Sequence, residues 1–264
     1  MAAPTLEAMP PSPPPFYLDW TFWTAVVAVL AVVLSQLPPL RILFRRAALA
    51  LQPYDRLNVT HYVGNPNVNL HVQLTNTGGR DVRMVSLTLK ITRDDGATIT
   101  LPAQTFTWPD DTNAAMIFTP LALEPGDEWA GFVSFFVPFS ATDEREWKRI
   151  AKDLRADIDT KLRAHRLVAG ENPKEPVEAD PARVAPLTAF FRAKRFWQPG
   201  EYAVQLTATC DPTRATITRR FRFTIFESDV QDLDEREARY KYGAGVYFTD
   251  AEQVEVNPRI RELD

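Results

Sequence analysis

Residues 82–93 read VRMVSLTLKITR, and this stretch decides the fold class. Apolar and polar side chains alternate along it, with Val85, Leu87, Leu89 and Ile91 in one set and Ser86, Thr88, Lys90 and Thr92 in the other. Successive side chains of a β-strand point to opposite faces of a sheet, so the pattern predicts a strand with one buried face. Asp94-Asp95-Gly96 follows directly and predicts a hairpin, because an Asp-Gly pair tolerates positive φ.

The same alternation recurs on both sides of this hairpin. It predicts further strands at LNVTHYV (57–63), VNLHVQLTN (68–76), TITLPAQTFTW (98–108), AAMIFTPLAL (114–123), EWAGFVSFFVPF (128–139), PLTAFFRAKRFW (186–197), EYAVQLTATC (201–210) and ATITRRFRFTIF (215–226). Turn signals such as Asn65-Pro66-Asn67 and Gln198-Pro199-Gly200 separate them. About eight short strands at this spacing predict a mainly β chain folded as an antiparallel β-sandwich.

One helix interrupts the strands. The segment TDEREWKRIAKDLRADIDTKLRAHRLV (142–168) carries an apolar stripe at steps of three or four, formed by Trp147, Ile150, Leu154, Ile158 and Leu162. Such a stripe predicts an amphipathic helix that packs on the sandwich or binds a partner helix. A polar, proline-rich loop follows at 170–186, so we expect a helix-loop insertion over 142–186 in a domain that covers 55–228.

Three pieces of the predicted strands resemble a known family. LTNTGGRDVRMVSLTLKI, LALEPGDEWAGFVSF and WQPGEYAVQLTATC look like parts of the bacterial immunoglobulin-like, cell-adhesion-related (CARDB-like) sandwich domains. The resemblance covers about 57–139 and 187–227; it implies an immunoglobulin-like sandwich and no particular function. Tyr202, two residues after Gly200, stands where a tyrosine corner would be formed.

The N-terminal part is organised around an uncharged run. Residues 20–37 read WTFWTAVVAVLAVVLSQL, and at about 1.5 Å per residue such a run just spans a hydrocarbon core of roughly 30 Å. Trp20 and Trp23 stand at its start, where aromatic rings favour the headgroup level. We therefore expect a transmembrane helix over 19–37, after a proline-rich tail over 1–18; a buried core helix is the alternative.

The flanks of this run predict an orientation. Glu7 and Asp19 precede it, whereas Arg41, Arg45 and Arg46 follow it. The positive-inside rule then places the N-terminus outside and the C-terminal domain in the cytoplasm. If residues 40–52 of the juxtamembrane segment 38–54 form a helix, its arginines would contact lipid phosphates at the membrane surface; a plain structural connector is the alternative.

Candidate catalytic and metal-binding residues are few. The chain of 264 residues has one cysteine and three histidines, and no zinc-ligand spacing or phosphate-binding loop. His61 and His71 fall on the polar side of the predicted strands, so we read them as surface residues. A net charge of −4 gives no general reason to expect nucleic-acid binding. The sequence therefore predicts no cofactor, no metal site and no enzyme, and it identifies no small-molecule substrate.

The segment FFRAKRFW (190–197) mixes the cations Arg192, Lys194 and Arg195 with four aromatic residues, of which Trp197 is the last. Stacking combined with phosphate contacts would bind single-stranded nucleic acid or lipid headgroups. A strand with a basic outer face explains the same residues, and the acidic tail over 229–264 could dock on it.

These observations favour a membrane-anchored, non-catalytic interaction module, that is, a scaffold, adaptor or sensor subunit that binds a protein partner or a second copy. The alternative is an exported, surface-anchored domain that binds a ligand or a glycan. A membrane-bound enzyme is the third hypothesis.

Overall fold

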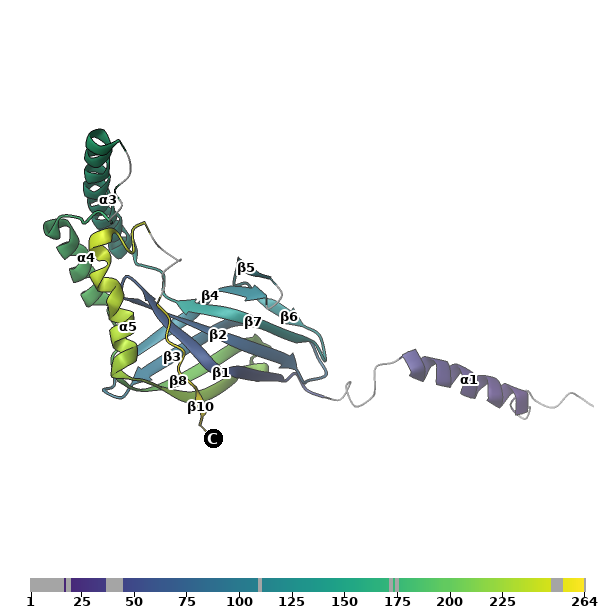
Figure 1. Cartoon of the computed structure of the whole chain (residues 1–264). Helices are drawn as coiled ribbons and strands as arrows, with labels where there is room; N and C mark the ends of the chain where they lie inside the picture. Colours follow the sequence, from purple (N-terminus) through teal and green to yellow (C-terminus); the bar gives the residue numbers. More distant parts are fainter. Residues whose placement is uncertain are drawn as a thin grey trace, which may run out of the picture. The chain divides into compact units, whose positions relative to one another are not determined.

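The protein divides into two units in the computed structural model, one up to Arg45 and one from Arg46 onwards. The structure describes residues 17, 20–36, 45–108, 111–170, 173, 176–247 and 254–263. The first unit contains helix α1, Trp20–Gln36. The second unit contains the sheet and the other helices (Figure 1).

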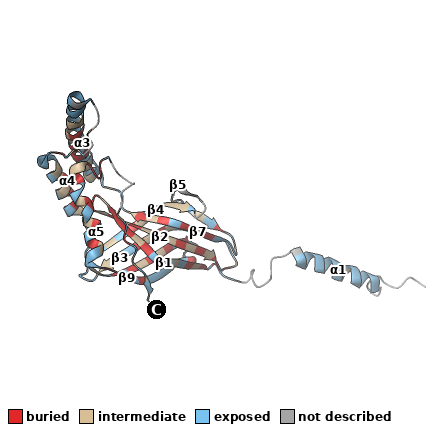
Figure 2. Cartoon of the chain, viewed as in Figure 1, coloured by how far each residue is buried: buried red, intermediate tan, exposed pale blue. Residues whose placement is uncertain are grey.

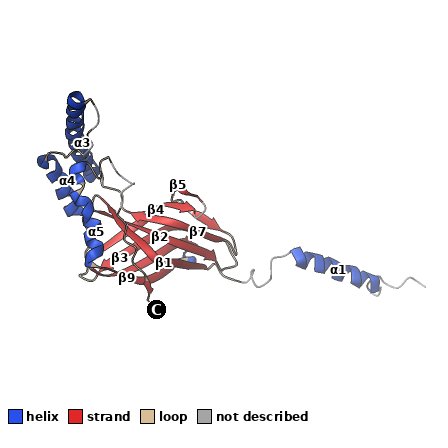
Figure 3. Ribbon diagram, in the orientation of Figure 1, coloured by secondary structure: helices blue, strands red, loops and turns tan. Residues whose placement is uncertain are grey.

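A ten-stranded antiparallel sheet forms the body of the second unit (Figure 3). Its strands are β1 (Leu49–Tyr62), β2 (Asn65–Asn76), β3 (Val82–Arg93), β4 (Thr98–Trp108), β5 (Asp111–Ile117), β6 (Leu121–Leu123), β7 (Glu128–Phe136), β8 (Gly200–Asp211), β9 (Ile217–Ile225) and β10 (Arg261–Glu262). The order is β1-β2-β7-β4-β3-β8-β9-β10, with β5 paired to β4 and β6 to β3. The mainly β, antiparallel architecture predicted from the sequence is confirmed.

Strand β4 joins the two halves of the sheet. Its residues 98–102 pair with β3, and its residues 103–107 pair with β7. The change of partner falls at Pro102, which donates no backbone hydrogen bond and so marks a natural break in a ladder. Because one strand belongs to both halves, the sheet curls into a nearly closed, barrel-like form, and the sandwich type that we expected is not established.

The last described residues close the other side of this barrel-like sheet. We call residues 254–263 the C-terminal strap. Val256 and Val59 exchange backbone hydrogen bonds of 2.7 and 2.9 Å, and Ile260 N–H donates to the Asp55 carbonyl. Further on, β10 pairs with β9, and Leu263 N–H donates to the Arg220 carbonyl. The strap therefore covers the free edges of β1 and β9.

The interior of the sheet is one apolar cluster (Figure 2). Its largest fully buried side chains include Tyr202, Phe135, Phe221, Phe223, Leu51, Leu70, Leu74 and Met84. Tyr202 and Phe223 stack at 4.9 Å between ring centroids. Burial of this kind contributes roughly 1.5–3 kcal/mol for each large side chain, which makes the cluster the main source of the domain's stability.

Tyr202 makes the corner contact that its position predicts. Its hydroxyl donates to the Gln198 carbonyl at 2.7 Å and accepts from Gln198 N–H at 2.8 Å. The contact ties the start of β8 back to the segment that precedes it, which is the role of a tyrosine corner. The hairpin predicted at Asp94-Asp95-Gly96 is also confirmed, since it joins β3 to β4 and Gly96 has a φ of 89°.

Two details of the predicted strands are wrong. The register between β3 and β8 shifts between Met84 and Ser86, so the predicted core residue Val85 is exposed while Met84 and Leu87 are buried. A bulge resets the two-residue period in this way. The turn between β1 and β2 lies at Val63-Gly64, with φ of 47° and 85°, and not at residues 65–67.

Three helices gather at one end of the sheet, and we call them the helical cap (Figure 1). They are α3 (Ala141–Ala169), α4 (Pro181–Lys194) and α5 (Glu227–Ala238). Helix α3 was predicted, and Ser140 caps its N-terminus. Helix α4 corrects the strand predicted over 186–197 and the loop predicted up to 186. Asp180 caps it and Pro181 occupies its first turn.

The first unit differs from the predicted anchor. Among the residues that the structure describes, no helix is both long and apolar enough to cross a membrane. Helix α1 has 17 residues, and Trp20 and Trp23 in its first turn are exposed.

The juxtamembrane helix is wrong from Leu49 onwards, where β1 begins, because Gln52 pairs with β2. Of its predicted headgroup contacts, Arg41 lies outside the described residues, and Arg45 and Arg46 are exposed in a non-helical segment.

Candidate functional site

The helical cap has an apolar core of its own. Ile150, Leu154 and Ile158 of the predicted stripe are buried in it, and Trp147 packs at its margin. The rest of this core comes from α4 and from residues 240–246, with Leu187, Phe190, Phe191, Tyr240 and Val246 as its large members. The stripe therefore packs mainly within the cap and not on the face of the sheet.

The turn between β1 and β2 joins the sheet to the cap. Val63 is buried among the cap residues. At Gly64, a Cβ atom would lie 2.3 Å from the Phe191 carbonyl oxygen, so only glycine allows this approach of the turn to α4. A positive φ is unfavourable for a β-branched residue such as Val63, and its burial against the cap offsets that strain.

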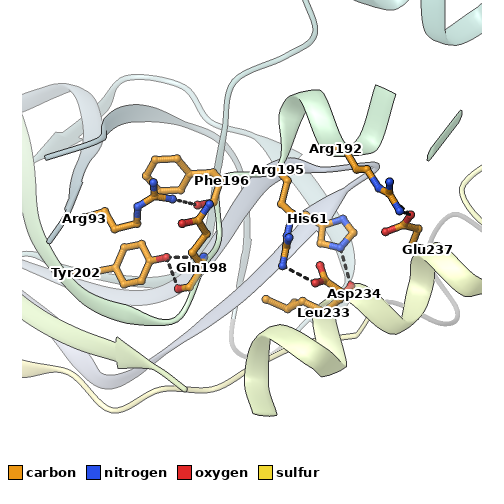
Figure 4. A network of polar contacts seen from close by, with 10 residues as sticks. All are labelled: His61, Arg93, Arg192, Arg195, Phe196, Gln198, Tyr202, Leu233, Asp234 and Glu237. Carbon is orange, nitrogen blue, oxygen red and sulfur yellow. Dashed lines mark hydrogen bonds and ion pairs between the residues drawn. The ribbon is translucent and has the colours of Figure 1, made fainter. Parts of the chain in front are cut away.

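His61 links the same turn to α5 (Figure 4). Its Nδ1 accepts from Gly64 N–H at 3.1 Å, and its Nε2 lies 2.9 Å from the Leu233 carbonyl oxygen. These partners require a neutral ring with its proton on Nε2. The pKa of His61 is lowered to about 4, mainly by burial, and the nearby Arg236 and Arg195 charges contribute in the same direction. The prediction of a surface histidine is wrong.

The cations predicted as a binding patch are paired with carboxylates (Figure 4). Arg192 forms an ion pair of 2.7 Å with Glu237, and Arg195 pairs with Asp234, both on α5. Lys194 lies 2.7 Å from Asp143 of α3, and this contact holds the pKa of the Asp143 carboxyl below its usual value. Docking of the acidic C-terminal region on this segment, one of the predicted alternatives, is therefore confirmed.

The aromatic residues of the same segment are turned inward. Phe190 and Phe191 lie in the cap core, while Trp197 is buried in the sheet core and its Nε1–H donates to the Thr60 carbonyl at 2.8 Å. Buried rings cannot stack on bases, so the reading of this segment as a nucleic-acid or headgroup site has no support. The segment fastens the cap to the sheet.

A groove opens on the outer part of the cap, between α3 and the chain that follows α5. We call it the cap groove. It has a volume of about 610 Å³, and its apolar wall consists of Ile158, Leu162, Pro176, Val177, Ala244, Tyr242 and Tyr247. Arg239 lies at its margin. This size and lining are typical of sites that bind a ligand or a partner side-chain cluster.

The distal end of α3 extends beyond this groove. From Thr160 to Ala169 the helix carries cationic residues and no acidic one, the cations being Lys161, Arg163 and Arg166. Leu167 and Val168 are 87% and 91% exposed there. These two adjacent apolar side chains lie more than one helical turn beyond Leu162, the last residue of α3 that lines the groove.

Most residues of this site were not predicted from the sequence. His61 shares the two-residue phase of the buried Leu57 and Val59, and that phase would have revealed its burial. Tyr242 and Tyr247 had no such signal, because they come from irregular chain. Within the described ranges, no cluster of three or more metal-ligating side chains is found.

The comparisons with known proteins leave the chain without a family assignment. No protein-family model matches the sequence. No curated protein matches it either.

Proposed function

We propose that the chain is a non-catalytic interaction module held at a membrane by helix α1. The observation that supports this most is the surface of α1. Its apolar side chains are exposed in every direction, for example Val29 at 63% and Leu30 at 53%, although consecutive residues lie about 100° apart on a helix. An all-round apolar helix is stable when lipid or protein covers it.

Helix α1 is short for a membrane span, so the proposed attachment depends on thinning of the bilayer around it. Its 17 residues, at about 1.5 Å each, reach about 25 Å, and a bilayer accommodates a short apolar helix by local thinning. The charge asymmetry of the flanks favours a cytoplasmic C-terminal domain.

The cap groove is the surface that we propose for the protein partner. The proposed occupant is an amphipathic helix with acidic residues along its polar edge. The apolar wall of Leu162, Tyr242 and Tyr247 suits the apolar face of such a helix. The cations at the end of α3 suit its acidic edge, which would speed the encounter and set its direction.

Membrane attachment is tested by fractionation of the full-length chain. Val27→Asp with Leu30→Asp places two charges in the middle of α1, each at a cost of about 3 kcal/mol in a bilayer. We expect the wild-type chain to resist alkaline extraction and this variant to be released. Val85→Asp with Met116→Asp is the matched control, because it alters two apolar residues of the sheet that are about half exposed, as Leu30 is, and it should stay with the membrane. Release of both variants, or of neither, contradicts the proposal.

The docking surface is tested by site-specific photo-crosslinking in native membranes. A crosslinker at position 167 is expected to give one discrete adduct, and charge reversal at Lys161 and Arg163 should remove it. Phe226, an exposed apolar residue outside the groove, is the control position. An adduct that survives the charge reversal, or that forms equally from position 226, would sink the groove assignment.

A further inference from the structure

A second hollow lies on the outer face of the sheet, beside the C-terminal strap. We call it the strap cleft. It has a volume of about 540 Å³ and is lined by Tyr54, Asn58, Asn69, His71, Phe132 and Glu255, among others. The cleft is independent of the helical cap and of α1.

The cleft is lined by a row of side chains from neighbouring strands. Asn58 of β1 stands opposite Asn69 of β2, and Asn69 stands opposite Ser134 of β7. One step along, His71 stands opposite Phe132. Facing residues on paired strands lie about 4.5–5.5 Å apart at Cβ, so these groups form one continuous surface. Their neighbours in sequence, such as Leu57 and Leu70, point into the core.

A bulge in β1 builds one wall of the cleft. Between Pro53 and Leu57 the chain advances four residues while its partner β2 advances two, from Val72 to Leu70. The extra residues lift Tyr54 off the sheet, where it is 59% exposed. Bulges are frequent beside functional sites because they redirect a side chain in this way.

Three rings form an aromatic wall. The ring of His71 lies 4.9 Å from that of Phe132 and 6.1 Å from that of Tyr54, in edge-to-face contacts. Phe132 is 47% exposed, so a flat apolar surface faces the cleft. Aromatic surfaces of this kind give contact area at little cost in conformational entropy.

The floor is polar and incompletely hydrogen-bonded. The side-chain oxygens of Asn58 and Asn69 are buried and have no partner among the described residues. The Asn58 amide nitrogen donates to the Glu255 carboxylate of the strap. An unpaired buried oxygen costs about 1–3 kcal/mol, so a side-chain rotation that turns either oxygen toward a donor in the cleft would be favoured.

The charges around the cleft balance. Arg56 and Glu255 are the two charged residues of its described lining, and they have opposite signs. A balanced pair gives no net attraction for an anion or a cation. An uncharged ligand with many hydroxyl groups and an apolar face fits these features best, because it can donate to the amide oxygens and pack on the rings.

We propose that the strap cleft binds a neutral saccharide, as a mono- or disaccharide unit. The hydroxyl groups donate to Asn58 and Asn69, and the C–H face of the sugar packs on the aromatic wall. The proposal does not rest on the membrane attachment or on the partner proposed above.

The test is saturation-transfer NMR with the full-length chain in detergent, using glucose, galactose, mannose, N-acetylglucosamine and their disaccharides as probes. At least one neutral saccharide is expected to bind, with a dissociation constant in the millimolar range or below. Phe132→Ala should weaken that binding about tenfold, by removing the ring contact. Tyr242→Ala, in the cap groove, is the matched control and should leave it unchanged.

A second variant keeps the test valid if Phe132→Ala unfolds. Asn69→Asp preserves the size of the side chain, replaces the amide by a carboxylate and places a second negative charge near Glu255, so it should abolish saccharide binding while the far-ultraviolet spectrum stays the same. Absence of binding by every neutral probe, stronger binding of inorganic phosphate, or equal binding by wild type and Asn69→Asp would overturn the proposal.

Discussion

The sheet and the helical cap bury their apolar side chains in different ways. The sheet is closed on both sides, by β4 and by the C-terminal strap, around one large apolar cluster. The cap has a smaller cluster that a groove of about 610 Å³ leaves open. It meets the sheet through the turn at Val63-Gly64 and through the hydrogen bonds of His61 and Trp197. A closed core gives rigidity, whereas an open one leaves apolar surface for a partner, and this contrast underlies the proposal that a protein partner binds the cap.

Phe135→Ala should give the largest loss of stability, through the core of the sheet. Phe135 is fully buried in the sheet core, where β7 pairs with β2. Loss of its ring leaves a cavity and should lower the free energy of unfolding by about 4 kcal/mol. Denaturant unfolding measures this, and both sheet and cap should unfold at the lower midpoint, because the cap depends on the sheet. A cap that keeps its wild-type midpoint would show that it is stable alone.

Leu154→Ala should destabilise the cap core in the same way. Leu154 is fully buried between α3 and the rest of the cap core. The change should cost about 3 kcal/mol, expressed mainly as local opening of the cap. Fluorescence of Trp147, at the margin of the cap core, should report an earlier transition than far-ultraviolet signal from the sheet. Coincident transitions would merge the two regions into one cooperative unit.

His61 makes the junction between the regions sensitive to pH. Its folded pKa is about 4, below its ordinary value of 6.5, so the unfolded chain takes up the proton first as the pH falls. The stability that depends on the neutral ring is complete above pH 6.5 and declines down to about pH 4, by up to about 3 kcal/mol. His61→Gln should flatten this slope in unfolding measurements made across that range. An unchanged slope would locate the pH dependence elsewhere.

Arg192→Ala should have the smallest effect. The Arg192–Glu237 pair bridges α4 and α5, but its arginine side chain is largely exposed. Solvent and salt screen such pairs, so we expect a loss below about 1 kcal/mol that shrinks further at high salt. Thermal unfolding at low and high salt measures it, with Arg149→Ala on α3 as an exposed control. A loss comparable with that of Leu154→Ala would mean that charge pairing, and not the cap core, holds these helices.

The sequence predicted the sheet better than the cap, and particular residues explain why. The two-residue period identified the strands of the sheet, and the one residue misplaced on β3, Val85, lies at a bulge. Helix α4 had a readable signal in Asp180-Pro181, a capping residue followed by proline in the first turn, but the alternation around Phe190 obscured it.

The candidate sites depend on contacts between distant segments, which periodicity does not encode. The cap groove combines Ile158 with Tyr242, and the strap cleft combines Asn58 with Glu255. The pairing of Arg195 with Asp234 was foreseen only as docking of an acidic region on a basic one. Charge and composition therefore indicated which regions of the chain would pair, but the individual residue contacts could be identified only in the structure.

Native-state hydrogen exchange on the full-length chain tests the division between sheet and cap most directly. We predict that the amides of Val72 and Leu206, in the closed sheet, exchange only through global unfolding. The amides from Leu162 to Val168, at the distal end of α3, should exchange through local opening at much lower free energy. Equal protection of the two sets would contradict the account, because the cap would then be as rigid as the sheet.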